Sequence, residues 1–112
     1  MKVGMLTAPF AKESLEVVLD FAESASIPCL EVVTQPGGKH IDPDKLTPKR
    51  VKAIRDALDE RMLEISSLAY YTCDITNPKL VGKVQAQAKK TIDAAVKLGV
   101  PVVCMLSGFP AE

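Results

Sequence analysis

The residues of this chain that are best suited to chemistry gather in one short stretch, EVVTQPGGKHIDPDKL, at positions 31–46. The only histidine of the chain, His40, is closely followed by Asp42 and Asp44. An imidazole together with carboxylates can hold a divalent ion. The same spacing is also ordinary turn chemistry before a helix, in which Asp side chains accept hydrogen bonds from nearby backbone N–H groups. We favour the turn, and we expect no metal ligand here.

Glu31 stands inside a run of residues, 28–34, that is otherwise almost entirely apolar. A buried carboxylate is rare unless it is paired or functional. If the run is a strand, alternation places Cys29, Glu31 and Val33 on one face. Glu31 then points either into a polar interior or toward a structural partner. Glu64 raises the same question more weakly, because it lies near the start of its run.

Two other places could contact a ligand. Tyr70 and Tyr71 end a third apolar run, where a tyrosine can stack on a sugar or bond to a hydroxyl group, or lie partly buried beneath a loop. Ser107 and Gly108 end the last apolar run, where backbone N–H groups could approach a ligand or simply form a turn.

Four short apolar runs and three helical patterns alternate along the chain. Strands are predicted at residues 2–8, 28–34, 62–71 and 101–107, and the first helix at 14–25 with Ser14 as its cap. Thr47-Pro48 and Asn77-Pro78 predict the starts of two more helices, and Gly99 the end of the last one. The buried stripe of that last helix is predicted to contain Val81, Val84, Ala88, Ile92 and Ala95.

This β-α-β-α-β-α-β order predicts an α/β fold with a parallel sheet and right-handed crossovers. In such folds, ligands bind at the carboxyl ends of the strands and in the loops that follow them. The long loop that contains Gly37, Gly38 and His40 falls on that side, as do Tyr71 and Ser107. The helix-to-strand turns are short by contrast, which favours a binding face at the strand carboxyl ends.

Composition excludes several classes of partner. Lys plus Arg and Asp plus Glu number 14 each, so we expect no nucleic-acid partner and no anionic membrane partner. No apolar run approaches the roughly 20 residues of a membrane helix, and the N-terminus does not resemble a signal peptide. Cys29, Cys73 and Cys104 are too widely spaced for a zinc site, so we expect buried, reduced thiols in a cytoplasmic protein.

Four segments of the chain together resemble a known family: MKVGMLTAPF, SLEVVLDFAESASIPCLEVVTQPGGKHIDPDKL, LEISSLAYYTCDITNP and AAVKLGVPVVCMLSGFP. They are similar to the N-terminal half of sugar phosphate isomerase/epimerase proteins, which have the xylose isomerase-like TIM barrel. The resemblance rests on the order and spacing of TAPF, EVVTQPGGKH, LAYY and LSG, and it covers essentially the whole chain.

The resemblance implies the first half of a (β/α)8 barrel that isomerises or epimerises sugars or sugar phosphates, often with Mn²⁺, Mg²⁺, Co²⁺ or Zn²⁺. Relatives draw their metal ligands and catalytic glutamates from later strands, so this chain alone is expected to bind no metal and to be inactive. Substrate contacts are expected from Glu31, His40, Tyr71, Ser107 and Gly108. Tyr71 stands where many relatives carry a histidine in a shorter motif, which argues against a metal contact from that loop.

Residues 1–112 are therefore expected to form a single partial domain, a half-barrel of four strands and three helices. A half-barrel leaves two open sheet edges, so we expect self-association or pairing with a missing C-terminal half. The alternative is a self-contained α/β domain that binds a ligand or partner without catalysis. A metal-dependent endonuclease of the same barrel superfamily is disfavoured by the neutral charge.

Overall fold

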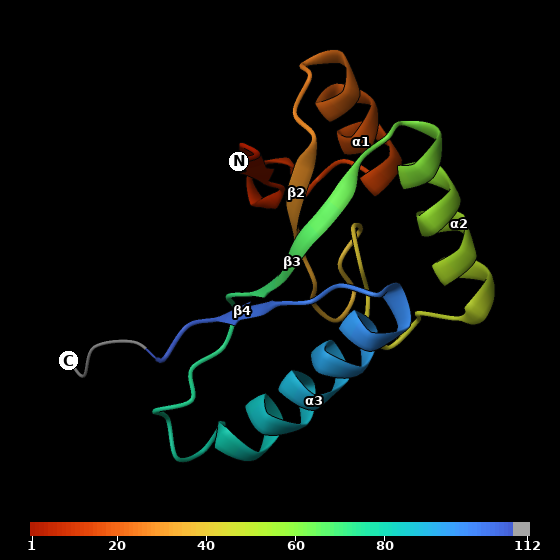
Figure 1. Ribbon diagram of the computed structural model, residues 1–112. Helices are drawn as coiled ribbons and strands as arrows, with labels where there is room; N and C mark the ends of the chain where they lie inside the picture. The colour runs from red at the N-terminus through yellow and green to blue at the C-terminus, as the bar shows by residue number, and fades with distance from the viewer. Residues whose placement is uncertain (109–112) are drawn as a thin grey trace.

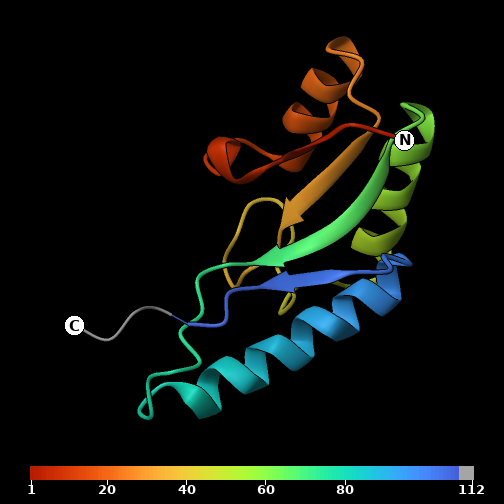
Figure 2. The same cartoon turned by 60° about the vertical axis from the view of Figure 1, so that its left-hand side comes forward.

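The computed structural model describes residues 1–108 and contains one four-stranded sheet. The strands are β1 (Gly4–Leu6), β2 (Cys29–Val33), β3 (Glu64–Tyr70) and β4 (Val103–Met105). Their order in the sheet is β1-β2-β3-β4, and every pair is parallel. The arrows of β2, β3 and β4 point the same way in Figure 2. The predicted α/β fold with a parallel sheet is confirmed, although each strand is shorter than its predicted run.

Three α-helices connect the strands: α1 (Leu15–Ser24), α2 (Pro48–Glu60) and α3 (Val81–Leu98), with a short 3-10 turn, η1 (Ala8–Phe10), after β1. The predicted N-cap residues are confirmed at the starts of two helices. The Ser14 hydroxyl accepts from the backbone N–H of Val17, and the Thr47 hydroxyl accepts from that of Arg50. Gly99 ends α3 with φ of +70°, a backbone conformation that favours glycine.

The start of α3 differs from the prediction. Asn77-Pro78 forms a turn rather than the first helical turn, and the helix begins at Val81. The Asn77 side-chain oxygen accepts from the backbone N–H of Lys79 at 3.0 Å, so this local bond competes with helix formation.

The predicted buried stripe of α3 is also partly wrong. Ile92 is 51% exposed and Ala88 is only partly buried. The stripe was predicted from hydrophobicity alone, but the small or polar residues Thr91 and Gln87 face the sheet instead. The buried residues of α3 are Val84, Gln87, Thr91, Ala94, Ala95 and Leu98.

All three helices lie on one face of the sheet (Figure 1). Consecutive strands are neighbours, so right-handed crossovers that always step in the same direction place every helix on the same side. The core between the two layers includes Leu30, Val32 and Leu68, each fully buried. We call this side of the sheet the helix-covered face and the other side the helix-free face. Sequential strand order with one layer of helices is the arrangement of half of a (β/α)8 barrel.

The strand register determines which residues share the helix-free face. Leu6 of β1 pairs with Glu31 of β2, and Glu31 pairs with Ser67 of β3. The β2–β3 register shifts between Leu30 and Glu31, because Leu30 pairs with Ile65 and the next pair skips one residue of β3. This β-bulge brings Ser67 opposite Glu31, and the sequence alone did not reveal it.

The three cysteines are all unpaired, as expected. Cys29 and Cys73 are buried, but Cys104 is only half-buried, so the expectation of burial is wrong for that thiol. Cys104 lies on β4, an end strand of the sheet, where no further strand covers it. Among residues 1–108, no helix has both the length and the apolar character needed to cross a membrane.

Candidate functional site

Glu31 lies at the centre of a polar cluster on the helix-free face. The Ser67 hydroxyl donates to Glu31 Oε2, and the Tyr71 hydroxyl donates to Glu31 Oε1, each at 2.6 Å. These short bonds are typical of hydroxyl groups that donate to a carboxylate. We call Glu31, Ser67, Tyr71 and Cys104 the Glu31 cluster. Its residues come from β2, β3, β4 and the residue that follows β3, so the sheet itself holds them in place.

The cluster favours the ionised form of Glu31. Partial burial raises the pKa of its carboxyl, but hydrogen bonds from Ser67, Tyr71 and Cys104 outweigh burial and leave the pKa below its ordinary value. Glu31 is therefore a carboxylate at neutral pH. The hydrogen bond to Glu31, together with burial, raises the pKa of Tyr71, so its hydroxyl keeps its proton and acts as a donor.

A small hollow of about 150 Å³ lies at the carboxyl ends of the strands, next to the Glu31 cluster. Its lining residues are Ala8, Ala11, Val33, Gln35, Ala69, Tyr71 and Thr72. Pockets that enclose a small ligand typically measure about 300–1,000 Å³. The hollow is smaller than this range.

His40 is buried, and both of its ring nitrogens are engaged within the chain. Nδ1 lies 2.9 Å from the Thr7 hydroxyl, and Nε2 lies 3.1 Å from the Phe10 carbonyl oxygen. A carbonyl oxygen can only accept, so Nε2 carries the proton and Nδ1 accepts from Thr7. The Thr7 oxygen itself accepts from the backbone N–H of Val33. Through these two hydrogen bonds, His40 connects the loop after β2 to the loop after β1.

The environment of His40 favours its neutral form. Burial lowers the pKa of the imidazole, and this effect exceeds the opposing contributions of the Phe10 and Glu13 backbone and of the Glu16 charge. Its predicted contact with a substrate stays a prediction, and such a contact would require one of its two bonds to open.

The two aspartates near His40 are used in local structure. Asp42 accepts from the backbone N–H groups of Gly37 and Asp44, each at 2.9 Å. Asp44 forms an ion pair with Lys90 of α3 at 2.6 Å. Within residues 1–108, no group of three or more His, Cys, Asp or Glu side chains could hold a metal ion. The described residues therefore do not fit a complete metal site.

The other predicted positions are more dispersed. Ser107 is exposed beyond the end of β4. Gly108 has φ of +132°, and a Cβ added there would collide with the Thr76 side chain, so this glycine permits close packing on the loop after β3. Tyr70 is buried against Val84 on the helix-covered face, and Glu64 forms an exposed ion pair with Lys2. Of the predicted contacts, the structure joins Glu31 and Tyr71 directly.

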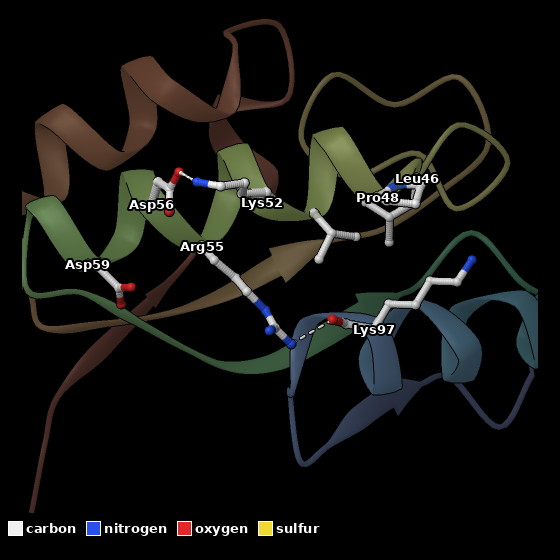
Figure 3. Close-up of a pocket in the computed structure, with 8 residues that line it drawn as sticks. Leu46, Pro48, Lys52, Arg55, Asp56, Asp59 and Lys97 are labelled. Atoms are coloured by element: carbon white, nitrogen blue, oxygen red, sulfur yellow. Dashed lines mark hydrogen bonds and ion pairs between the residues drawn. The ribbon is translucent and has the colours of Figure 1, made fainter.

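A larger groove of about 580 Å³ lies elsewhere, between α2 and α3 in the helix layer (Figure 3). Three of its charged side chains, those of Lys52, Asp56 and Arg55, already have partners within the chain. Lys52 pairs with Asp56 at 2.6 Å, and Arg55 Nη2 donates to the Lys97 carbonyl oxygen at 2.7 Å. The Arg55 cation thus lies at the negative end of the α3 dipole, where it stabilises the helix. We assign this groove to the packing of neighbouring helices rather than to the site.

Sequence reasoning missed Ser67, Thr7 and Cys104 as members of these networks. Ser67 stands in an apolar strand. That its hydroxyl lies directly across from the Glu31 carboxylate can be recognised only when the strand register is known. Thr7 is the last residue but one of the first apolar run, and its two bonds join segments more than 25 residues away in sequence. Neither the contact of Ser67 nor those of Thr7 can be predicted from the spacing of neighbouring residues.

The fold also occurs in a solved structure described as a xylose isomerase domain protein from Planctomyces limnophilus. The two align with a TM-score of 0.75 and 17% identity over 98% of this chain and 42% of that one. The likeness shows the fold, a parallel sheet with helices on one face, and this chain spans less than half of that structure. No family model and no curated protein matches the chain.

Proposed function

We propose that this chain forms the N-terminal half of a metal-dependent sugar or sugar phosphate isomerase or epimerase. The observation that carries the proposal is the Glu31 cluster: an ionised carboxylate, held by two hydroxyl donors, on the helix-free face of a xylose isomerase-like fold. In a complete barrel this face lines the interior, and the strand carboxyl ends form the active-site face.

In this proposal, the chain binds and orients the substrate and does not carry out the proton transfer. Glu31 retains lone pairs beyond those used by Ser67 and Tyr71, and these can accept hydrogen bonds from sugar hydroxyl groups. His40, Tyr71, Ser107 and Gly108 are the other proposed contacts. The metal ligands and the catalytic acids would come from the second half of the barrel, so the chain alone is inactive.

NMR titration of the chain with aldoses, ketoses and their phosphates tests the proposal. We expect weak, saturable shifts at Val33, Tyr71 and Thr72, because these residues line the hollow beside the Glu31 cluster. The Glu31→Gln variant should lose these shifts. Shifts confined to the α2–α3 groove, or the absence of any shift with every sugar, would contradict the assignment.

Titration with Mn²⁺ or Zn²⁺ tests the second part of the proposal, that the metal ligands come from the other half of the barrel. We expect no tight, stoichiometric binding to this chain, since the described residues offer no three-ligand cluster. Tight one-to-one binding would show that the chain carries its own metal site and would overturn the proposed division of roles.

A further inference from the structure

The Glu31 carboxylate has hydrogen-bond donors around it but no cation. Its donors are the hydroxyl groups of Ser67 and Tyr71 and the thiol of Cys104, all of which are uncharged. Among the ion pairs formed by residues 1–108, none includes Glu31. A partly buried carboxylate is usually paired with a cation. The Glu31 cluster therefore keeps a net negative charge.

Three basic side chains on the same side of the sheet have other partners. Lys39, in the loop after β2, donates from Nζ to the Lys12 carbonyl oxygen at 2.5 Å. Arg50, in the first turn of α2, forms an ion pair with Glu16. Both ring nitrogens of His40 bond to uncharged groups of the chain. These three side chains therefore do not offset the charge of Glu31.

The hollow beside the Glu31 cluster is lined without any charged side chain. Ala8, Ala11 and Ala69 give it small apolar walls, and its other polar groups, Gln35 and Thr72, are neutral. Proteins usually bind phosphate with Arg or Lys side chains. The lining offers neither of them, and a nearby carboxylate repels an anion.

The carboxylate of Glu31 can still accept a hydrogen bond from a ligand. An ionised carboxyl group has about four acceptor positions, and the three donors of the cluster occupy three of them at most. A sugar hydroxyl is uncharged and can donate to the remaining position. A phosphate group carries a charge of about −1.5 to −2 at pH 7 and offers mainly acceptor oxygens. Glu31 thus attracts the first group and repels the second.

We propose that the Glu31 cluster makes this part of the site specific for an uncharged, hydroxyl-bearing end of the substrate and excludes a phosphate group. The inference rests on the proposed function and determines how a sugar phosphate lies in the site. The unphosphorylated end contacts Glu31, and the phosphate group points away from it. A sugar that carries phosphate at both ends has no suitable end and is rejected, so repulsion contributes to the specificity.

NMR titration of the chain with fructose, fructose 1-phosphate, fructose 6-phosphate and fructose 1,6-bisphosphate tests this specificity. Fructose and both monophosphates should shift Val33, Tyr71 and Thr72 with affinities within about threefold of one another, because each has an unphosphorylated end. The bisphosphate should bind at least about tenfold more weakly, because one of its phosphates must approach Glu31.

A bisphosphate that binds as tightly as fructose would overturn the inference and leave the proposed function standing. Fructose that gives no shift would also overturn the inference. The proposed function fails only if every other sugar gives none as well, so the two failures are distinguishable.

Nuclear Overhauser effects between the ligand and the Val33 methyl groups show which end of a monophosphate enters the hollow, since Val33 lines it. With fructose 6-phosphate, the contacts should come from the protons on carbon 1 of the sugar. With fructose 1-phosphate, they should come from the protons on carbon 6. Contacts from the phosphorylated end in both complexes would contradict the inferred orientation.

Two isosteric variants test whether the charge of Glu31 is responsible. Glu31→Gln should abolish the preference, so that fructose binds no better than the bisphosphate. Glu64→Gln is the matched control, because it removes the same charge from an exposed ion pair with Lys2 at the amino end of β3. It should keep the preference of at least about tenfold.

Circular dichroism should show the same fold in both variants, because glutamine has the shape of glutamate. A preference that survives in Glu31→Gln, or that Glu64→Gln abolishes as fully, would show that the cluster is not its source and would overturn the inference.

Discussion

Neighbouring residues of β2 serve two different parts of the molecule. Leu30 and Val32 are fully buried on the helix-covered face, whereas Glu31 between them faces the helix-free side and accepts bonds from Ser67 and Tyr71. The same strand thus supplies the core through one set of alternate residues and the candidate site through the other. Substitutions on the two faces should therefore separate stability from ligand binding.

The largest effect on stability should come from truncation on the helix-covered face. Val32→Ala removes two methyl groups from a fully buried site, so it should lower the free energy of unfolding by about 2–3 kcal/mol. Val33→Ala makes the identical change one residue later, on the helix-free face, where the side chain is only partly buried.

Urea unfolding of the two variants measures this difference. Val33→Ala should cost roughly half as much as Val32→Ala, or less, because less apolar surface is lost from burial. Equal losses would show that the helix-free face is packed as tightly as the core, and the contrast between the two faces would fail.

A smaller effect should appear at the carboxyl ends of the strands, where His40 joins two loops. The pKa of His40 is lowered in the folded chain, so the unfolded chain binds its proton more readily. Stability should be full above pH about 6.5, the ordinary histidine value, and should fall as the pH drops below it.

Because His40 is the only histidine, the His40→Gln variant gives a clean comparison. The unfolding free energies of wild type and variant, measured at pH 7.5 and 5.5, should converge at the lower pH. Equal pH dependence in the two proteins would contradict the neutral, doubly bonded His40.

The smallest effect concerns a polar group on the helix-covered side. Gln87 of α3 is buried, and within residues 1–108 its Nε2 is the buried side-chain atom without a hydrogen-bond partner. Gln87→Met keeps the length of the side chain and removes the unsatisfied donor. It should leave stability unchanged or raise it by up to about 1 kcal/mol, as thermal unfolding would show. A clear loss would indicate that Gln87 has a partner in solution.

The sequence predicted the features of the fold that depend on local patterns. Strand and helix order followed from apolar periodicity, and the ends of helices followed from Ser14, Thr47 and Gly99, whose capping is a property of a few neighbouring residues. The buried face of α3 was partly missed, because the sheet and not the hydrophobicity of Ile92 decided which side packs inward.

The candidate site was predictable only in part. Glu31 was singled out because a carboxylate in an apolar strand needs a partner, and Tyr71 because it ends a strand. Their mutual bond depends on a bulge in β3 and on strand pairing across 40 positions of sequence. The engagement of His40 by Thr7 and Phe10 likewise depends on loops that meet only in the folded chain.

The most direct test of the Glu31 cluster is an NMR titration of the Glu31 side-chain carboxyl carbon in wild type, Tyr71→Phe and Tyr70→Phe. The two tyrosines are adjacent, but Tyr70 packs on the helix-covered face, so Tyr70→Phe is the matched control. We predict a Glu31 pKa below its ordinary value in wild type and in Tyr70→Phe, and a higher pKa in Tyr71→Phe, which lacks one donor. A wild-type pKa at or above the ordinary value, or an unchanged pKa in Tyr71→Phe, would contradict the account.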